Sequence, residues 1–234
     1  MINVTRVMHM KDSARSIYHR FDVPGRAEYD HFMSQPEQQS VSAIVLAGGQ
    51  SRRMGRDKAL IEYQGRPIIA HVIDTLRALS DDLVVVSNRS DLYGPFGARV
   101  VADYDPPCGP LGGIAAGLRA AQHQLAVVVA CDMPFLNVPL LRWLIHLAEE
   151  YDAVVPQTGD EFEPLHAAYR RECYSPIVRR LDRGERRVIS FFADVRLRPV
   201  LESEWRTLDP AGRSLINLNT PDDLDVLSST ADSG

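Results

Sequence analysis

The sequence predicts an α/β protein with three layers: a mostly parallel central sheet with helices on both faces. From residue 41 onward, short runs of β-branched and aliphatic residues alternate with segments of helical periodicity, which is typical of strands covered on both faces. A glycine-rich basic segment, Leu46–Lys58, directly follows the first of these runs. This alternation implies right-handed β-α-β crossovers, and such sheets bind ligands beyond the carboxyl ends of their strands.

Five apolar runs are the expected strands. They are Ala43–Leu46, Leu83–Val86, Val100–Ala102, Leu125–Ala130 and Ala153–Val155. Three helices are expected between and after them, because apolar residues recur at helical spacing. They are Pro67–Leu79, Pro110–Gln122 and Val138–Tyr151. Pro67 is expected in the first turn, where a missing N–H costs nothing. Thr220, followed by proline and two acids, is the expected start of a last helix.

The length of 234 residues suits one α/β domain, or at most two small ones. Residues 1–40 are polar, carry mixed charges and show no periodicity. They are predicted to be a flexible N-terminal extension, or to result from a translation start placed too early. Residues 41–230 form the predicted domain.

Composition excludes several classes of function. A formal net charge of −5 argues against general binding of nucleic acid. No run of about 18 apolar residues occurs, so no membrane-spanning helix is expected. The three cysteines show no C-x-x-C spacing, which argues against a zinc site and fits a reducing cytoplasm.

The segment Leu46–Lys58, LAGGQSRRMGRDK, has the composition of a phosphate-binding loop. Glycines let backbone N–H groups approach phosphate oxygens, and arginine and lysine neutralise phosphate charge. Its spacing matches neither the P-loop nor the G-x-G-x-x-G pattern. Arg53 and Lys58 are the candidate catalytic cations of this loop. The alternative is a solvated basic turn.

Asp132 directly follows the fourth expected strand, in the segment CDMP. A carboxylate at a strand end is costly unless it binds something, and beside a triphosphate it would be repelled. A divalent cation between the two removes the repulsion, and Mg²⁺ is the expected cofactor with Asp132 as its ligand. The alternative role for Asp132 is a helix cap or a turn residue before Pro134.

Six motifs occur in an order found in one known family. They are LAGGQSRRMGRDKA (46–59), GRPI (65–68), GPLGG (109–113), CDMPFL (131–136), GERRV (184–188) and NLNTP (217–221). With them the chain, from about Ser42 to Leu227, closely resembles the molybdenum cofactor guanylyltransferases, the MobA family. The glycine-rich motif alone would indicate only the wider nucleotidyltransferase superfamily, whereas Asp57-Lys58, GERRV and NLNTP narrow the resemblance.

The resemblance implies a Rossmann-like nucleotidyltransferase fold and transfer of GMP from GTP to the phosphate of molybdopterin. Pyrophosphate would be released and molybdopterin guanine dinucleotide formed. It also implies a cytoplasmic enzyme, with transient contacts to other cofactor-biosynthesis proteins or apo-molybdoenzymes. Residue by residue, it implies GTP contacts at Leu46, Ala47, Gly48, Gly49, Lys58, Asn88, Asp103 and Asp132, and a pterin side near Asn217 and Asn219.

Three questions remain open from the sequence. Asp103 is expected to bind the base or the ribose, and its alternative is a turn before Pro106. The segment Glu163–His166 (EPLH) departs from the His-Pro-Thr type of some relatives, which leaves the pterin side undefined. The competing functions are a molybdopterin cytidylyltransferase, a nucleotidyltransferase for another small phosphate, and a non-catalytic carrier of the pterin cofactor.

Overall fold

The computed structural model describes residues 40–47, 58–104 and 106–218. The chain divides between Gln35 and Pro36, and all described residues belong to the second unit. The predicted N-terminal extension and the helix expected to begin at Thr220 lie outside the described residues.

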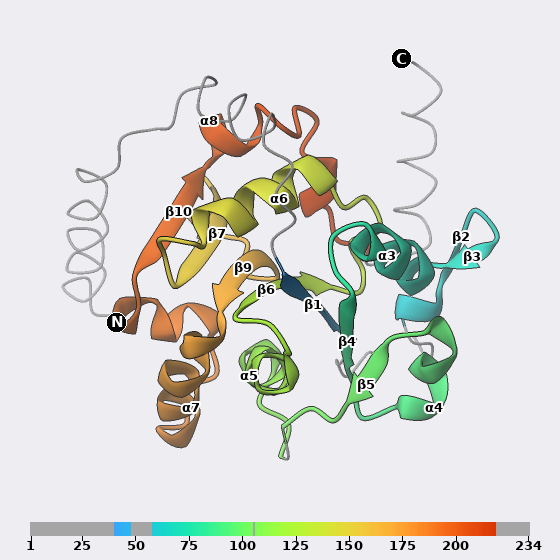
Figure 1. Cartoon of the computed structure of the whole chain (residues 1–234), viewed down its shortest axis with the longest axis horizontal. Helices are drawn as coiled ribbons and strands as arrows, with labels where there is room; N and C mark the ends of the chain where they lie inside the picture. Colours follow the sequence, from blue (N-terminus) through green and yellow to red (C-terminus); the bar gives the residue numbers. More distant parts are fainter. Residues whose placement is uncertain (1–39, 48–57, 105, 219–234) are drawn as a thin grey trace, which may run out of the picture. The chain divides into compact units, whose positions relative to one another are not determined.

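The centre of the described chain is a mixed, mostly parallel sheet of eight strands in the order β10-β7-β9-β6-β1-β4-β5, with β8 paired to β7 (Figure 1). The strands are β1 (Val41–Leu46), β4 (Asp82–Val86), β5 (Arg99–Val101), β6 (Leu125–Ala130), β7 (Ala153–Thr158), β8 (Glu161–Phe162), β9 (His166–Arg170) and β10 (Leu197–Leu201). The β1–β4, β1–β6, β4–β5 and β7–β10 pairs are parallel. This architecture confirms the predicted fold class.

The antiparallel strand β9 is the main feature that the sequence did not predict. It lies between β6 and β7 and is antiparallel to both. Its sequence, HAAYR, is rich in alanine and lacks the β-branched run that marks the other central strands. The strand β10 was also missed, because Arg198 and Pro199 interrupt its apolar pattern.

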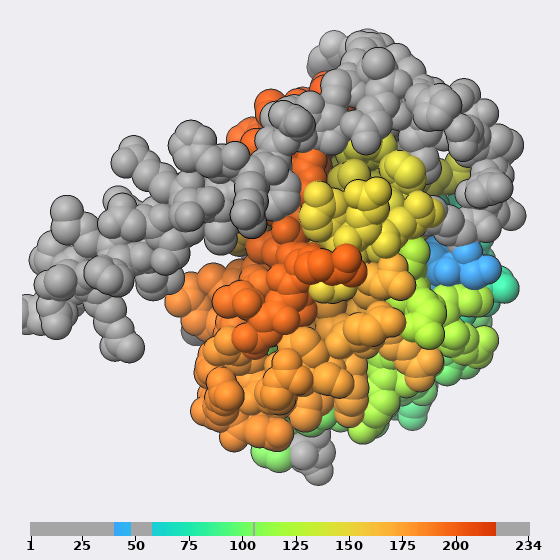
Figure 2. Space-filling model, turned by 60° about the vertical axis from the view of Figure 1, so that its left-hand side comes forward, coloured from blue at the N-terminus to red at the C-terminus, as the bar shows by residue number. Residues whose placement is uncertain are grey.

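Helices cover both faces of the sheet (Figure 1). One face carries α5 (Pro110–Ala120), α7 (Tyr174–Asp182) and the 3₁₀ segment η4 (Val188–Asp194), and the other carries α3 (Ile68–Arg77) and α6 (Val138–Leu147). Figure 2 shows the last third of the described chain, in orange and red, gathered on one face of the molecule. Within the described ranges, no helix combines the length and apolar character that crossing a bilayer requires.

All three predicted helices exist, but with shorter bounds. The helix α6 ends at Leu147, with Ala148 as its C-cap, and does not reach Tyr151. Pro67 is the N-cap of α3 and pairs in a short hairpin, so its place in the first helical turn was predicted wrongly by one residue. The shorter elements are η1 (Lys58–Leu60), β2 (Glu62–Tyr63), β3 (Arg66–Pro67), α4 (Ser90–Tyr93), η2 (Gly94–Phe96), η3 (Arg171–Cys173), α8 (Glu202–Trp205) and η5 (Arg213–Leu215).

The helix α5 packs unusually close to β1, and glycine makes this possible. A Cβ atom on Gly113 would lie 3.3 Å from Cδ2 of Leu46, and one on Gly117 would overlap the Ile44 side chain. Because interiors are close-packed, a methyl group there would push α5 away from the sheet. The glycines therefore keep the N-terminal end of α5 beside the end of β1.

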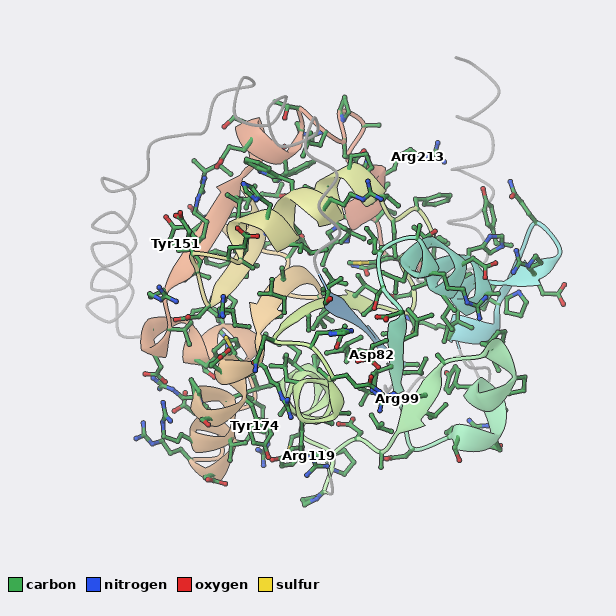
Figure 3. All side chains as sticks on the ribbon, in the orientation of Figure 1. Asp82, Arg99, Arg119, Tyr151, Tyr174 and Arg213 are labelled. Carbon is green, nitrogen blue, oxygen red and sulfur yellow. The ribbon has the colours of Figure 1, made fainter. Side chains whose placement is uncertain are left out.

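A buried carboxylate joins β1, β4, β5 and the end of α5 (Figure 3). Asp82 accepts hydrogen bonds from Ser42 Oγ (2.6 Å), Gln122 N–H (2.9 Å) and Arg99 Nη2 (2.6 Å). Burial raises the pKa of Asp82, but these donors outweigh burial and hold its pKa below the ordinary value. The charged form of Asp82 therefore fixes the start of the parallel strands, opposite the edge where they end.

Candidate active site

The strands β1, β4, β5 and β6 end at one edge of the sheet, called here the carboxyl edge. Backbone hydrogen bonds between neighbouring strands continue one residue beyond the strand ends. The residues that directly follow these strands therefore lie side by side. These bonds run from Ala47 N–H to Val86 O (3.0 Å), from Ser87 N–H to Val101 O (2.9 Å) and from Cys131 N–H to Leu46 O (3.2 Å). Leu46 and Ala47 are buried, at 8% and 7% exposure.

Asn88 and Asp103 were predicted separately, from the ends of two strands, and a hydrogen bond joins them. The Asp103 N–H donates to Asn88 Oδ1 at 3.0 Å. One carboxylate oxygen of Asp103 accepts from the N–H of the next residue, Tyr104, at 2.7 Å. Burial raises the pKa of Asp103, and the Tyr104 N–H partly offsets that rise. One oxygen of Asp103 is thus held by the backbone, its second oxygen has no hydrogen bond to the described residues, and its expected contact with the base or the ribose stays a prediction.

Asp132 and Lys58 lie within electrostatic reach of each other, although 74 positions separate them in the sequence. Asp132 follows β6, and Lys58 opens η1 after the glycine-rich segment. Burial raises the pKa of the Asp132 carboxyl, while its own N–H and the charge of Lys58 act in the opposite direction. The carboxylate is half-buried, so it can still meet a ligand from solvent.

The NLNTP segment also reaches Asp132. The Leu218 N–H donates to the Asp132 carbonyl at 2.9 Å, which places the exposed Asn217 next to this strand end. The η5 turn that precedes the segment is held by Asp209, whose Oδ2 accepts from Ser214 Oγ (2.7 Å) and from the Ser214 N–H (2.8 Å).

Four of the predicted site residues lie outside the described part of the chain: Gly48, Gly49, Arg53 and Asn219. The described ones, from Leu46 to Asn217, gather at the carboxyl edge. Their roles stay predictions, since position alone assigns no chemistry.

Sequence analysis missed the polar corner where β7, β8 and β9 meet. Because β9 runs antiparallel to β6, its beginning lies at the carboxyl edge, and the Ala130 N–H donates to Leu165 O at 3.0 Å. Glu163 is half-buried there, and His166 is fully buried. Burial raises the pKa of Glu163, and the charge of Glu161 raises it further. The EPLH motif was the one available signal.

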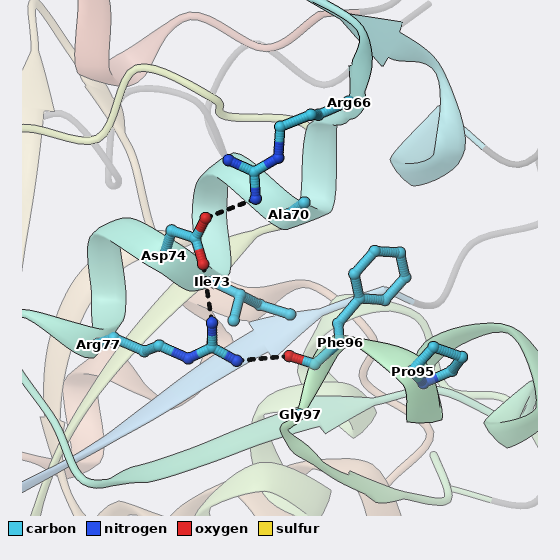
Figure 4. A pocket seen from close by; sticks show the side chains of 8 residues that line it. All are labelled: Arg66, Ala70, Ile73, Asp74, Arg77, Pro95, Phe96 and Gly97. Atoms are coloured by element: carbon cyan, nitrogen blue, oxygen red, sulfur yellow. Dashed lines mark hydrogen bonds and ion pairs between the residues drawn. The ribbon is translucent and has the colours of Figure 1, made fainter.

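A separate cavity of about 240 Å³ lies between α3 and η2 (Figure 4). Arg66 and Arg77 both bond Asp74, at 2.6 and 2.8 Å, and Arg77 also donates to Phe96 O at 2.7 Å. These contacts already satisfy the two guanidinium groups in part. None of the residues predicted to bind substrate lines this cavity.

Comparison with known proteins identifies the family to which the residues at the carboxyl edge belong. Residues 43–222 match the model of the MobA-like NTP transferase domain, which covers most of the chain. The chain belongs to the MobA-like NTP transferase family. As a member of this family, it is a nucleotidyltransferase, and the matched range includes Lys58, Asp132 and Asn217.

Relatives of this MobA-like chain carry consistent names. The molybdenum cofactor guanylyltransferase of Desulfosudis oleivorans is 36% identical over 197 residues, covering 83% of this chain and 98% of that protein. The corresponding enzyme of Syntrophotalea carbinolica is 36% identical, covering 79% and 89%. The crystal structure of molybdopterin-guanine dinucleotide biosynthesis protein A from Archaeoglobus fulgidus aligns with a TM-score of 0.72 at 27% identity, covering 82% of this chain and all of that one.

A more distant structure shares the fold alone. The 2-C-methyl-D-erythritol 4-phosphate cytidylyltransferase of Thermus thermophilus aligns with a TM-score of 0.62 at 15% identity, covering 83% of this chain and all of that one. The Rossmann-like nucleotidyltransferase fold predicted from the sequence is therefore confirmed for this MobA-like protein.

Proposed function

We propose that this protein transfers GMP from GTP to the phosphate of molybdopterin, releasing pyrophosphate and forming molybdopterin guanine dinucleotide. The observation that carries the proposal is that Lys58 lies within electrostatic reach of Asp132 at the carboxyl edge, where the Asp132 carbonyl accepts from the Leu218 N–H of the NLNTP segment. The names of the relatives, molybdenum cofactor guanylyltransferases, support the choice of nucleotide and acceptor.

The chemistry requires the approach of two anions. The acceptor is already a phosphate, so little deprotonation is needed, and catalysis consists mostly of positioning for in-line attack on the α-phosphorus. Lys58 and Arg53 would bind the triphosphate oxygens and stabilise charge on the departing pyrophosphate. No covalent enzyme intermediate is expected, because the acceptor phosphate can itself attack the α-phosphorus.

Asp132 fits a magnesium site. Its carboxylate is half-buried, and burial raises its pKa, so a nearby cation would favour the charged form. Magnesium in phosphoryl-transfer sites is held by one or two carboxylates, with substrate phosphate and water completing the shell. Asp132 would be that ligand, and bound magnesium would neutralise charge on the triphosphate.

The remaining roles follow the positions along the sheet. The nucleoside would lie over β1, β4 and β5, because Asn88 and Asp103 meet there. The acceptor would lie over the other half, at β6 and beyond, next to Asn217. Proposed contacts to GTP are Leu46, Ala47, Gly48, Gly49, Lys58, Asn88, Asp103 and Asp132, and those to the pterin are Asn217 and Asn219.

The test is pyrophosphate release from each of the four nucleoside triphosphates in the presence of molybdopterin and magnesium. GTP should be the preferred donor. Asp132→Asn and Lys58→Met should each lower kcat about 100-fold or more, because each removes charge stabilisation from the transition state. Asp91→Asn, an exposed acid of α4, is the matched control and should retain full activity.

Other outcomes would favour the competing functions. Faster release with CTP would make the protein a cytidylyltransferase. Tight molybdopterin binding without pyrophosphate release from any nucleotide would make it a carrier. Full activity in both site variants would overturn the roles of Lys58 and Asp132, whatever the substrate.

The proposed reaction also implies a place in the cell. GTP and molybdopterin as substrates, together with three free cysteines, support a cytoplasmic enzyme. Transient contacts with other cofactor-biosynthesis proteins or with apo-molybdoenzymes would deliver the product.

A further inference from the structure

We propose that the Glu163 carboxylate recognises the acceptor by accepting hydrogen bonds from the paired N–H groups of its aminopyrimidinone ring. The proposal rests on the proposed function, because it assigns a residue to the acceptor half of the same site. It makes Glu163 a determinant of acceptor specificity, separate from the residues that would bind GTP.

The position of Glu163 follows from the sheet order. The strand β9 neighbours β6, at the usual spacing of about 4.8 Å between strands. The segment that precedes β9 therefore lies at the carboxyl edge beside Cys131 and Asp132, as the bond from the Ala130 N–H to Leu165 O confirms. The proposed nucleoside contacts lie on the opposite side of Asp132, at β1, β4 and β5.

The backbone around Glu163 is held on both sides. The Glu163 N–H donates to Pro156 O at 2.8 Å, and its carbonyl accepts from the His166 N–H at 3.1 Å. The preceding Phe162 packs edge-on against Phe192, with ring centroids 5.3 Å apart. A fixed backbone lowers the entropy cost of ligand binding, as expected for a recognition residue.

The carboxylate itself lacks a partner within the described part of the chain. No hydrogen bond or ion pair to its oxygens occurs among those residues, although the side chain is half-buried. Burial and the charge of Glu161 both raise the pKa of Glu163. A hydrogen-bond donor from a ligand would stabilise its ionised form. By contrast, the more deeply buried carboxylates of Asp82 and Asp209 each accept several hydrogen bonds from described residues.

Charge decides which part of the acceptor meets Glu163. A carboxylate with no metal ion beside it repels phosphate, so Glu163 does not suit the phosphate end of the acceptor. A pterin carries a ring N–H beside an exocyclic amino group, and two parallel N–H donors match the two oxygens of a carboxylate. The ring end of the acceptor therefore suits Glu163, while its phosphate lies toward Asp132 and Lys58.

The experiment combines a protein variant with a matched ligand pair. Binding of pterin and of lumazine, in which a carbonyl replaces the 2-amino group, is measured by ligand fluorescence. Wild-type protein should prefer pterin at least tenfold, since the lumazine carbonyl would face a carboxylate oxygen. Glu163→Gln should abolish this preference, because its amide places an N–H₂ donor against a ligand donor. Glu161→Gln, the exposed acid of the same hairpin, should keep it.

Kinetics give the second measurement. In guanylyl transfer, Glu163→Gln should raise KM for molybdopterin about tenfold or more, which corresponds to one lost charged hydrogen bond, and leave KM for GTP unchanged. Circular dichroism should show a folded variant, since the bonds that hold Glu163 come from its backbone.

The outcomes separate this inference from the proposed function. Equal affinity of wild-type protein for both ligands, including no detectable binding of either at millimolar concentration, overturns the role of Glu163. The role of Glu163 is also overturned if Glu163→Gln leaves the KM for molybdopterin unchanged. It is likewise overturned if this variant alters the dependence on magnesium and not the KM for molybdopterin. If wild-type protein transfers no nucleotide but still discriminates pterin from lumazine, the proposed function falls and the recognition role stands.

Discussion

His166 should make the folded protein sensitive to mild acid. Its side chain is completely buried, and neither ring nitrogen has a hydrogen-bond partner among the described residues. Burial lowers the pKa of His166 from 6.5 to about 4, and the nearby charge of Asp209 only partly opposes this effect. The folded state therefore holds a neutral imidazole at pH values where the unfolded chain binds a proton.

The sign and size of the effect follow from linkage between protonation and folding. The contribution of neutral His166 to stability is complete above pH 6.5 and is lost as the pH falls toward 4. A shift of this size corresponds to about 3 kcal/mol at most. At pH 5 the unfolded chain is already protonated and the folded state mostly is not, so about 2 kcal/mol should be lost.

The assay is urea unfolding of wild-type protein and His166→Gln at pH 7.5 and pH 5. Between the two pH values, wild-type protein should lose about 2 kcal/mol more free energy of unfolding than the variant. Any change caused by the substitution itself cancels, because only the pH dependence is compared, and His166→Phe should give the same result if Gln fails to fold. Parallel losses in wild-type protein and variants would refute the reasoning.

Three further substitutions test the packing and the buried charges, each by urea unfolding at neutral pH. Gly117→Ala should destabilise the protein by about 1–3 kcal/mol, because the added methyl overlaps Ile44; an unchanged midpoint would mean that α5 can retreat freely. Asp82→Ala should cost about 2–4 kcal/mol, since the buried Ser42 hydroxyl of β1 and the Gln122 N–H just after α5 lose their acceptor; equal stability would show that water replaces it. Arg198→Met should cost about 3–5 kcal/mol by leaving Glu204, 2.6 Å away, unpaired in the interior, and adding Glu204→Leu should recover most of that loss.

The residues expected at the carboxyl edge could be named from the sequence, because the motifs that mark them are local. The glycine-rich segment after β1, Asp132 after β6 and Asn217 in NLNTP are each marked by a few neighbouring residues. The general rule that parallel strands present their carboxyl ends at one edge was enough to bring Lys58 and Asp132 together. The structure places them within electrostatic reach of each other.

The acceptor half of the sheet was not predictable in the same way. The strand β9 follows β7 in the sequence but inserts between β6 and β7. Its alanine-rich sequence carries little intrinsic preference, so its place depends on backbone pairing with strands already present. Asp103 illustrates the same limit, because its hydrogen bonds to Asn88 and to the Tyr104 N–H depend on the backbone and not on the residue type alone.

The sequence by itself therefore determined the class of fold, the family and the chemistry of the nucleotide side, since periodicity and short motifs are properties of neighbouring residues. Tertiary structure alone decided which polar groups of the described residues are buried and which of their carboxylates lack a hydrogen-bond partner there. His166 and Glu163 lie three positions apart in one motif. Their burial depends on contacts with β6, β7 and residues near Asp209, and the surrounding sequence does not encode such contacts locally.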